Sequence, residues 1–202
     1  MKKRNRDIEF LFEIGTLRHV DRSWIQFLRG NVSTISEHIF RVMWIALIIA
    51  KHEGVKDTGK IVKMALVHDI TESRTGDAHY ISRQYVKRDE DLAIADMMEG
   101  TAIEDEFVEL WREHEKKLSI EAKIVKDADN LEVDFDLREQ PFEDEKRRAG
   151  WQPVRTQAVY DRLYTKTAKK MWKAIQSSNP HDWHRLGRNR FNAGDWKKKK
   201  RV

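Results

Sequence analysis

The chain has 202 residues, of which 40% are hydrophobic and 36% are charged, and it contains no cysteine. This length predicts one domain, and the apolar fraction is large enough to build a core. The absence of cysteine excludes a disulfide scaffold, a zinc site with cysteine ligands and a thiol nucleophile. Any metal site must therefore use histidine and carboxylate ligands.

The net charge is +5, but the excess of basic residues lies at the end of the chain. Residues 181–202 hold eight lysines and arginines against two acidic residues, so the rest of the chain has a net charge of about −1. The run Lys197–Arg201, with Trp183, Phe191 and Trp196 before it, is typical of a flexible tail that binds polyanions weakly. The basic character therefore belongs to a tail and not to the domain.

No segment predicts a signal peptide or a membrane span. The longest apolar run, Val42–Ala50, has nine residues, whereas a bilayer-spanning helix needs about 20. The apolar stretch after the basic start is interrupted by Asp7, Glu9 and Glu13, which a signal peptide does not tolerate. We expect a cytoplasmic protein without a membrane partner.

Apolar residues recur at helical spacing along the chain, which predicts an all-α fold. The expected helices cover residues 9–17, 34–53, 59–74, part of 77–100, 103–117, 120–138 and 153–177. Ser33 or Thr34 is expected to cap the second helix, and Gly54 to end it. Asp57 or Thr58 is expected to cap the third helix.

The second half of the chain has similar boundary signals. Ser119 is expected to cap the helix that starts at residue 120. Residues 141–150 predict a charged connection, and Pro153 is expected at the first position of a last long helix. Beyond Pro180 the helical pattern ends.

Histidines and acids gather in three short stretches of the expected helices: Ser36-Glu37-His38, His68-Asp69 with Glu72, and Asp127-Ala128-Asp129. On one helix, His68, Asp69 and Glu72 can face a common site because Glu72 is four residues from His68 and three from Asp69. They follow an apolar run, and buried polar groups cost free energy unless they are paired or bind a metal. Imidazole and carboxylate ligands suit Mn, Fe, Co, Ni or Zn. The alternative is that the histidines are ordinary core residues and the acids are solvated.

The order of these residues resembles the HD-domain superfamily of metal-dependent phosphohydrolases. The segments Ser36–His38, Leu66–Glu72, Thr75–Asp77 and Glu121–Asp129 are similar to its 5′-deoxynucleotidase branch. The resemblance covers about residues 10–140. It implies a compact helical bundle of the HD type and a homodimer. From the helical spacing and the charge distribution we expect about six to seven helices in one domain over residues 1–180, followed by a basic tail over 181–202.

The resemblance implies a role for each matching residue. The ligands of one divalent transition metal would be His38, His68, Asp69 and Asp129. Asp127 and Asp129 are about 200° apart on a helix, so only one of them can face the site, and the motif places the ligand at Asp129. Glu72 and Asp69 would be the catalytic acids, with Glu72 orienting the attacking water or handling a proton.

The resemblance also implies substrate-binding residues. Arg22 would hold the phosphate, Trp24 would lie against the sugar, and Asp77 would lie near the sugar. The spacing between Arg22 and Trp24 is one residue shorter than in the family, so Arg18 is an alternative for the phosphate. Residues 78–83 lack the prolines that family members carry there, which leaves the base preference open, and Arg83 is a further phosphate candidate.

The implied function is hydrolysis of deoxyribonucleoside 5′-monophosphates to deoxynucleoside and phosphate. One alternative is an HD hydrolase that acts on another nucleotide, such as a triphosphate or an alarmone. The sequence of the core shows few basic residues for gripping three phosphates, which argues against it. The other alternative is a nucleic-acid-binding module with a vestigial HD site, supported only by the tail.

Overall fold

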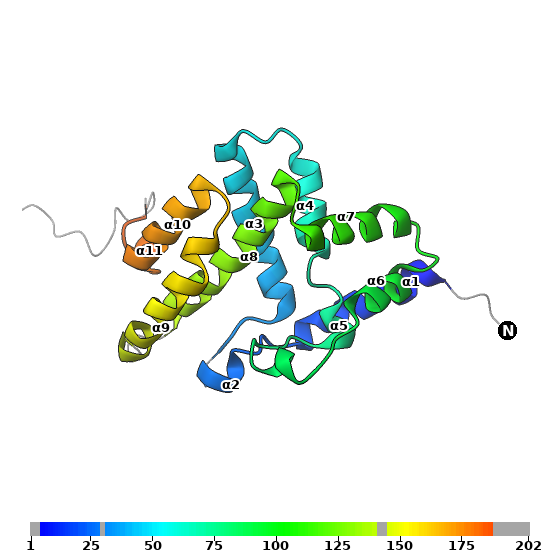
Figure 1. Ribbon diagram of the computed structural model, residues 1–202, viewed down its shortest axis with the longest axis horizontal. Helices are drawn as coiled ribbons and strands as arrows, with labels where there is room; N and C mark the ends of the chain where they lie inside the picture. The colour runs from blue at the N-terminus through cyan, green and yellow to red at the C-terminus, as the bar shows by residue number, and fades with distance from the viewer. Residues whose placement is uncertain (1–4, 29–30, 141–144, 188–202) are drawn as a thin grey trace, which may run out of the picture.

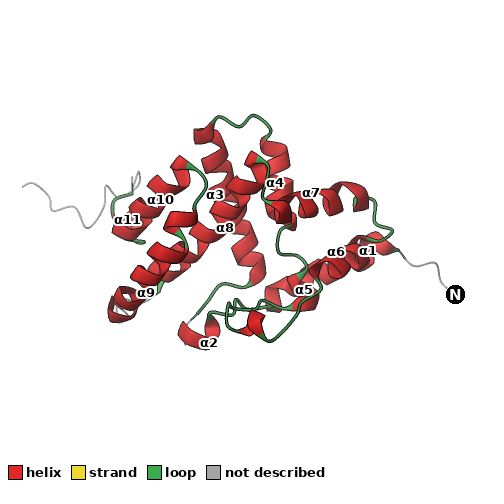
Figure 2. Cartoon of the chain, in the orientation of Figure 1, coloured by secondary structure: helices red, strands yellow, loops and turns green. Residues whose placement is uncertain are grey.

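The computed structural model describes residues 5–28, 31–140 and 145–187. These residues form helices and loops without a strand, as Figure 2 shows, so the all-α prediction is confirmed. The expected number of six to seven helices is too low for this part of the chain. Short helices of a single turn, such as α2 (Ile25–Leu28) and α5 (Glu72–Thr75), account for part of the difference. They could not be predicted, because four residues are too few to show a helical period.

The other helices in chain order are α1 (Arg6–Ile14), α3 (Ile35–Glu53), α4 (Thr58–Val67), α6 (Glu90–Met98), α7 (Glu104–Lys116), α8 (Ile120–Glu139), α9 (Glu145–Ala158), α10 (Lys166–Ser177) and α11 (Asp182–Arg185). Several end signals are confirmed. Thr34 caps α3 in a capping box with Glu37, and Gly54 ends it at a φ of 75°. Asp57 and Ser119 cap α4 and α8.

The core lies where α3, α4 and α8 pack together in the middle of the molecule (Figure 1). Its fully buried side chains include Ile35, Val42, Ile49, Ile61, Met64, Ile124 and Leu131. Helices α9 and α10 lie on one side of α8, whereas α1, α5 and α6 lie at the opposite end of the molecule (Figure 1). The Arg6 side chain of α1 donates a hydrogen bond to Glu99 O at the end of α6. This bond joins α1 to α6 at that end of the molecule.

The helix expected over 59–74 is interrupted. Helix α4 ends at Val67, residues 68–71 form a turn, and α5 begins at Glu72. In the turn, backbone bonds join residues three apart, such as Glu72 N to Asp69 O at 3.1 Å. The expectation that His68, Asp69 and Glu72 share one helix is therefore wrong. The turn directs Asp69 toward His38 and Arg22, contacts that local periodicity cannot predict.

The helix expected over 153–177 is also wrong in its bounds. Pro153 lies inside α9, which begins at Glu145, so part of the expected charged connection is helical. The chain then leaves the helix and re-enters it in α10, which Thr165 caps. The buried carboxylate of Asp127 accepts hydrogen bonds from the backbone of Tyr164 and Thr165. These bonds to α8 keep the backbone extended at Thr165, where sequence periodicity predicts a continuous helix.

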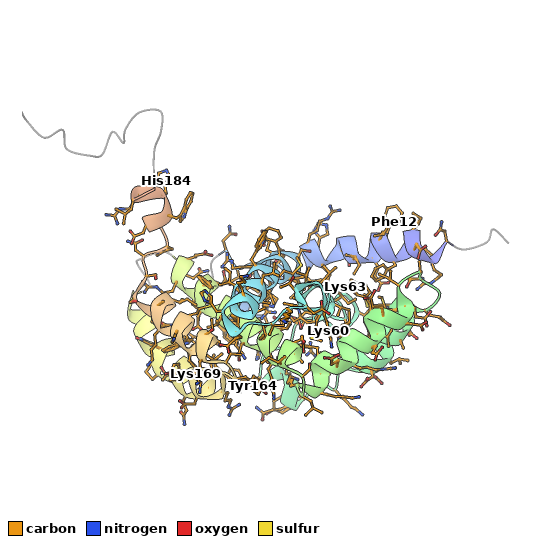
Figure 3. The ribbon with its side chains drawn as sticks, turned by 90° about the horizontal axis from the view of Figure 1, so that it is seen from above. Phe12, Lys60, Lys63, Tyr164, Lys169 and His184 are labelled. Carbon is orange, nitrogen blue, oxygen red and sulfur yellow. The ribbon has the colours of Figure 1, made fainter. Side chains whose placement is uncertain are left out.

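The expected tail lies mostly outside the described residues, including Phe191, Trp196 and Lys197–Arg201. Its first part forms the short helix α11, on which Trp183 is 79% exposed. Figure 3 shows α11, with His184, standing away from the other helices. Within the described ranges, none of the helices has the length and apolar character needed to cross a membrane.

Candidate metal centre

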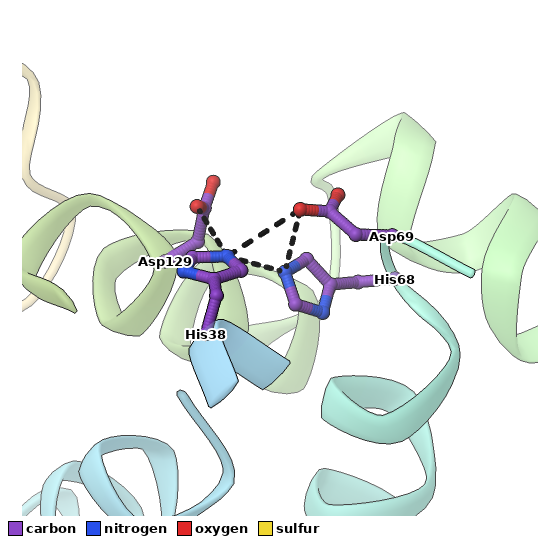
Figure 4. Close-up of side chains that lie close together, drawn as sticks. All are labelled: His38, His68, Asp69 and Asp129. Atoms are coloured by element: carbon purple, nitrogen blue, oxygen red, sulfur yellow. Dashed lines mark hydrogen bonds and ion pairs between the residues drawn. The ribbon is translucent and has the colours of Figure 1, made fainter. Parts of the chain in front are cut away.

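Two histidines and two aspartates from separate elements meet at one point (Figure 4). His38 comes from α3, His68 and Asp69 from the turn that follows α4, and Asp129 from α8. Each offers one ligand atom, and the four atoms lie within 4.8 Å of one another. His38 Nε2 is 3.3 Å from His68 Nε2 and 3.4 Å from an oxygen of each aspartate. The structure therefore brings together the four residues that the resemblance implied as ligands.

The Nδ1 atoms of His38 and His68 each have a hydrogen-bond partner outside the cluster. His68 Nδ1 lies 2.7 Å from Ala65 O. Because a carbonyl oxygen only accepts, Nδ1 donates this bond and Nε2 presents a lone pair to the cluster. His38 Nδ1 lies 2.6 Å from Glu132 Oε2, and both residues are buried. These partners orient both Nε2 atoms toward the same point, as in known metal sites.

The cluster has an electrostatic preference for positive charge. Burial disfavours the charged form of His38, but the carboxylates of Asp129, Asp69 and Glu132 outweigh burial and raise its pKa well above the usual range. Burial likewise disfavours the charged form of Asp69, and the neighbouring His68 and His38 nevertheless hold its pKa well below normal. Two ionised carboxylates and two imidazole nitrogens suit a divalent ion of intermediate softness. The residues therefore fit the metal that the resemblance implies.

Only one of the two neighbouring aspartates of α8 reaches this cluster. Asp129 lies beside His38, and Lys126 pairs with its other oxygen at 2.6 Å. Asp127 is fully buried and instead accepts bonds at 2.8 Å from Tyr164 N, Thr165 N and Thr165 Oγ1. Asp127 therefore belongs to the packing of α8 against the segment before α10.

Arg22 lies next to the cluster, although it precedes the first ligand helix by many residues. Its backbone N–H donates to Ser33 O, in the short bridge that joins the loop before α2 to the start of α3. Its buried guanidinium is 3.4 Å from Asp69 Oδ2 and 3.7 Å from Asp77 Oδ2. Asp77 also accepts from Ser23 N at 2.8 Å, which fixes the loop. Arg18 is exposed and bonds to its neighbour His19, outside the cavity.

Glu72 is buried at the same place. Arg88 donates to its Oε1 at 3.2 Å, and within the described chain its Oε2 is buried without a hydrogen-bond partner. Burial, together with the charges of Asp69 and Asp77, raises the pKa of Glu72 to about 9. Its carboxyl group therefore holds a proton at neutral pH.

One cavity of about 430 Å³ contains the residues expected to bind substrate, apart from the alternative Arg18. Arg22, Trp24, Asp69, Glu72, Asp77 and Asp129 all line it. Its basic lining residues are Arg22, Arg83, Arg88, Lys117, Lys126, Arg155 and Arg162. The cavity thus has more basic residues than the sequence suggested. The expected lack of basic residues therefore no longer argues against a triphosphate substrate. Several of them are already paired with acids, among them Arg88, Lys126 and Arg155.

Three residues of this site were missed by sequence reasoning: Glu132, Lys126 and Arg88. A signal existed for the first two, because each lies three residues from Asp129 and so shares its helix face. Arg88 follows a loop after Asp77, and no local pattern links it to Glu72. The tertiary fold, and not a helical period in the sequence, brings such loop residues to a site.

Comparison with known proteins agrees with this geometry. A sequence profile of the HD domain family matches residues 14–176. The 5′-deoxynucleotidase HDDC2 of Bos taurus is 31% identical over 160 residues, covering 76% of this chain and 74% of that protein.

Solved structures share the fold. The PH0347 protein of Pyrococcus horikoshii is 27% identical with a TM-score of 0.61, over 83% of this chain and 97% of its own. The cyanophage S-2L HD phosphohydrolase DatZ, bound to dA and one catalytic Zn²⁺ ion, is 19% identical with a TM-score of 0.58. The match covers 83% of this chain and 96% of DatZ. The chain therefore belongs to the HD domain family, in the branch that contains the 5′-deoxynucleotidase relatives.

Proposed function

We propose that this protein is a metal-dependent phosphomonoesterase that hydrolyses deoxyribonucleoside 5′-monophosphates to deoxynucleoside and phosphate. The observation that carries the proposal is one cavity lined by His68, Asp69, Asp129 and the buried Arg22, with His38 completing the four-residue cluster behind them. The 5′-deoxynucleotidase relatives support this substrate class.

The four cluster residues would hold one divalent transition metal, with Mn, Co, Fe, Ni and Zn as candidates. Zinc is favoured by the ion bound to the structurally similar DatZ. When bound, the ion supplies positive charge for the phosphate and acidifies the attacking water. Glu132 and the carbonyl of Ala65 hold the two Nδ1 atoms and would thereby orient both Nε2 atoms for metal binding.

Arg22 would bind the phosphate oxygens. Its charge is permanent, because Asp77 and Asp69 outweigh burial and raise the pKa of the guanidinium. Asp77 holds both the guanidinium and the loop at Ser23, so we assign it a positioning role in addition to its place near the sugar. Trp24 lines the cavity and packs edge-on against Trp151, with ring centroids 5.7 Å apart, which suits a wall beside the sugar.

Glu72 would act as a proton carrier. The leaving O5′ atom of the deoxynucleoside needs a proton when its bond to phosphorus breaks. In the metal-free protein the Glu72 carboxyl group has a pKa of about 9 and is protonated at pH 7, and a protonated carboxyl group at this place can donate to that oxygen. Arg88 holds one oxygen of Glu72, which leaves the other for the transfer.

Phosphate release tests the proposal directly. The chelated protein is loaded with Mn, Co or Zn and incubated with dAMP, dGMP, dCMP, dTMP and dUMP, and with AMP as a ribonucleotide control. We expect metal-dependent phosphate release from at least one deoxynucleotide. A metal-loaded protein that releases phosphate from none of the five contradicts the proposal. Release of pyrophosphate or triphosphate from dATP would instead support the alternative substrate class.

We propose that residues 1–180 form the catalytic domain and that 181–202 is an accessory tail that binds polyanions weakly, in a cytoplasmic protein. The profile match over 14–176 supports the boundary. Deletion of 181–202 is expected to leave phosphatase activity unchanged while heparin affinity falls. If activity falls with it, the tail belongs to the domain. Loss of polyanion binding from a protein without phosphatase activity would favour the nucleic-acid-binding alternative.

We also propose a homodimer, as the family resemblance implies. A cavity of about 450 Å³ with an almost entirely apolar lining runs between α1, α3 and α4, formed by residues such as Phe10, Ile14, Phe40 and Leu66. Phe40 is 61% exposed, and Phe12 points away from the molecule in Figure 3. Exposed apolar surface of this kind is typical of a protein interface. Light scattering of the wild type and Phe40→Asp is expected to give a dimer and a monomer, and a monomeric wild type contradicts the proposal.

A further inference from the structure

The segment after Asp77 forms part of the wall of the cavity that His68, Asp69 and Asp129 also line. Ala78, His79, Tyr80 and Arg83 line this cavity together with Asp69. Internal bonds hold the segment in shape, since Arg83 Nε donates to Ala78 O at 2.6 Å and Arg83 N donates to His79 O at 3.1 Å. Tyr80 thus projects from a stretch of backbone that is held in place on both sides.

The aromatic side chains of this wall differ in how much of each ring is already covered. His79 packs edge-on against Phe27, with ring centroids 5.0 Å apart, and its Nε2 lies 2.8 Å from Ser82 Oγ. Trp24 packs against Trp151. Tyr80 has an edge contact to His79 at 6.3 Å and remains 62% exposed although it lines the cavity. Tyr80 therefore offers a free ring face to a ligand.

The position of Tyr80 matches the reach of a nucleotide. Asp77 contacts Arg22, which contacts Asp69 of the cluster. Tyr80 follows Asp77 by three residues, and three residues of extended chain span about 11 Å at most. The backbone of Tyr80 therefore lies within about 11 Å of Asp77, and Tyr80 lines the same cavity as Arg22 and Asp69.

We propose that Tyr80 is the base-binding residue, and that its ring stacks on the nucleobase of the 5′-monophosphate. This inference rests on the proposed function, because it needs a nucleotide whose phosphate lies at the cluster. Every base has a flat π-face, so stacking on an aromatic side chain is tolerant of base identity. The site should therefore favour nucleotides over base-free phosphate esters and discriminate weakly among the bases.

The test compares three variants with dAMP and 2-deoxyribose 5-phosphate, which has the same sugar phosphate but no base. Tyr80→Ala is expected to raise the KM for dAMP about tenfold, which corresponds to about 1.4 kcal/mol, within the range of one base stack. Its kcat and its KM for 2-deoxyribose 5-phosphate should be unchanged. Tyr80→Phe keeps the ring and should behave as the wild type. Tyr85→Ala is the matched control, because Tyr85 is exposed in the same segment and lies outside the cavity lining.

An unchanged KM for dAMP in Tyr80→Ala overturns the inference, and so does an equal rise for both substrates. Binding of deoxyadenosine, measured by calorimetry, gives a readout that needs no turnover. It should weaken about tenfold in Tyr80→Ala, and equal affinity for both proteins contradicts base stacking. Failure of the proposed function is a distinct result, namely a wild type that releases phosphate from neither substrate.

Discussion

The two faces of α8 use the same residue type for opposite purposes. Asp129 on one face joins the cluster with His38, whereas Asp127, two residues earlier, accepts three hydrogen bonds from the segment before α10. Residues two apart point about 200° away from each other on a helix. The segment that packs against each face therefore decides whether an aspartate of α8 joins the histidine cluster or stabilises the fold through hydrogen bonds.

The contrast continues along the helix. Glu132 follows Asp129 on the first face and holds His38. Asp134 lies on the second face, where Arg155 of α9 donates two hydrogen bonds to it, at 3.2 and 2.7 Å. The first face should govern metal binding and turnover, and the second should govern the attachment of α9 and α10. Substitutions in pairs along α8 can test this division.

The largest effect is expected from removal of the ligand Asp129. Asp129→Ala should lower kcat/KM by about 1,000-fold or more, because the metal and the phosphate lose their arrangement. Phosphate release and metal content by elemental analysis measure the two effects. The free energy of unfolding of the metal-free protein should change little. If the variant keeps its metal and more than a tenth of the wild-type activity, Asp129 is not a metal ligand.

Asp127→Ala is the opposite case. Two backbone N–H groups and the Thr165 hydroxyl would lose their acceptor, and we expect the free energy of unfolding to fall by about 2–4 kcal/mol. Urea denaturation measures this change. The activity of the folded protein should stay within about threefold of the wild type, because the two sites are separate. A large activity loss without loss of stability would break the comparison.

Glu132→Gln should weaken metal binding by about 10- to 100-fold, because outer partners of this kind orient the ligand histidine. A competition titration with a metal-sensitive dye measures the affinity. Asp134→Asn is the matched control on the other face, and it should weaken stability while leaving metal affinity unchanged. Equal metal affinities for Glu132→Gln and wild type would show that His38 needs no support.

The smallest effect concerns the pH dependence of stability. Burial, together with the charge of Glu132, raises the pKa of Asp136 to about 6. A carboxyl group whose pKa is raised on folding stabilises the fold when protonated, and this contribution is lost as the pH rises from about 4 to 6. The free energy of unfolding should fall by about 1–2 kcal/mol more in the wild type than in Asp136→Asn over this range. If the free energy of unfolding depends on pH in the same way in both proteins, the raised pKa of Asp136 is contradicted.

Much of the fold could be predicted from local patterns. The bounds of α3 and α8 and their caps at Thr34 and Ser119 follow from signals within a few residues. The breaks at His68 and at Thr165 could not be predicted, because each depends on a contact with another helix. The same holds for the position of Arg22 beside Asp69, which depends on the bridge between Asp21 and Thr34.

The sequence by itself determined the helical class, the main helix ends and the residue types of a nitrogen and oxygen metal site, because periodicity, capping and motif spacing are local properties of the chain. Only the tertiary structure decided which aspartate of α8 joins the cluster and which acid supports its histidine. His38 and Glu132 are 94 residues apart, and such a pair exists only once α3 and α8 have packed. Burial then turns these acids from solvated groups into determinants of metal binding.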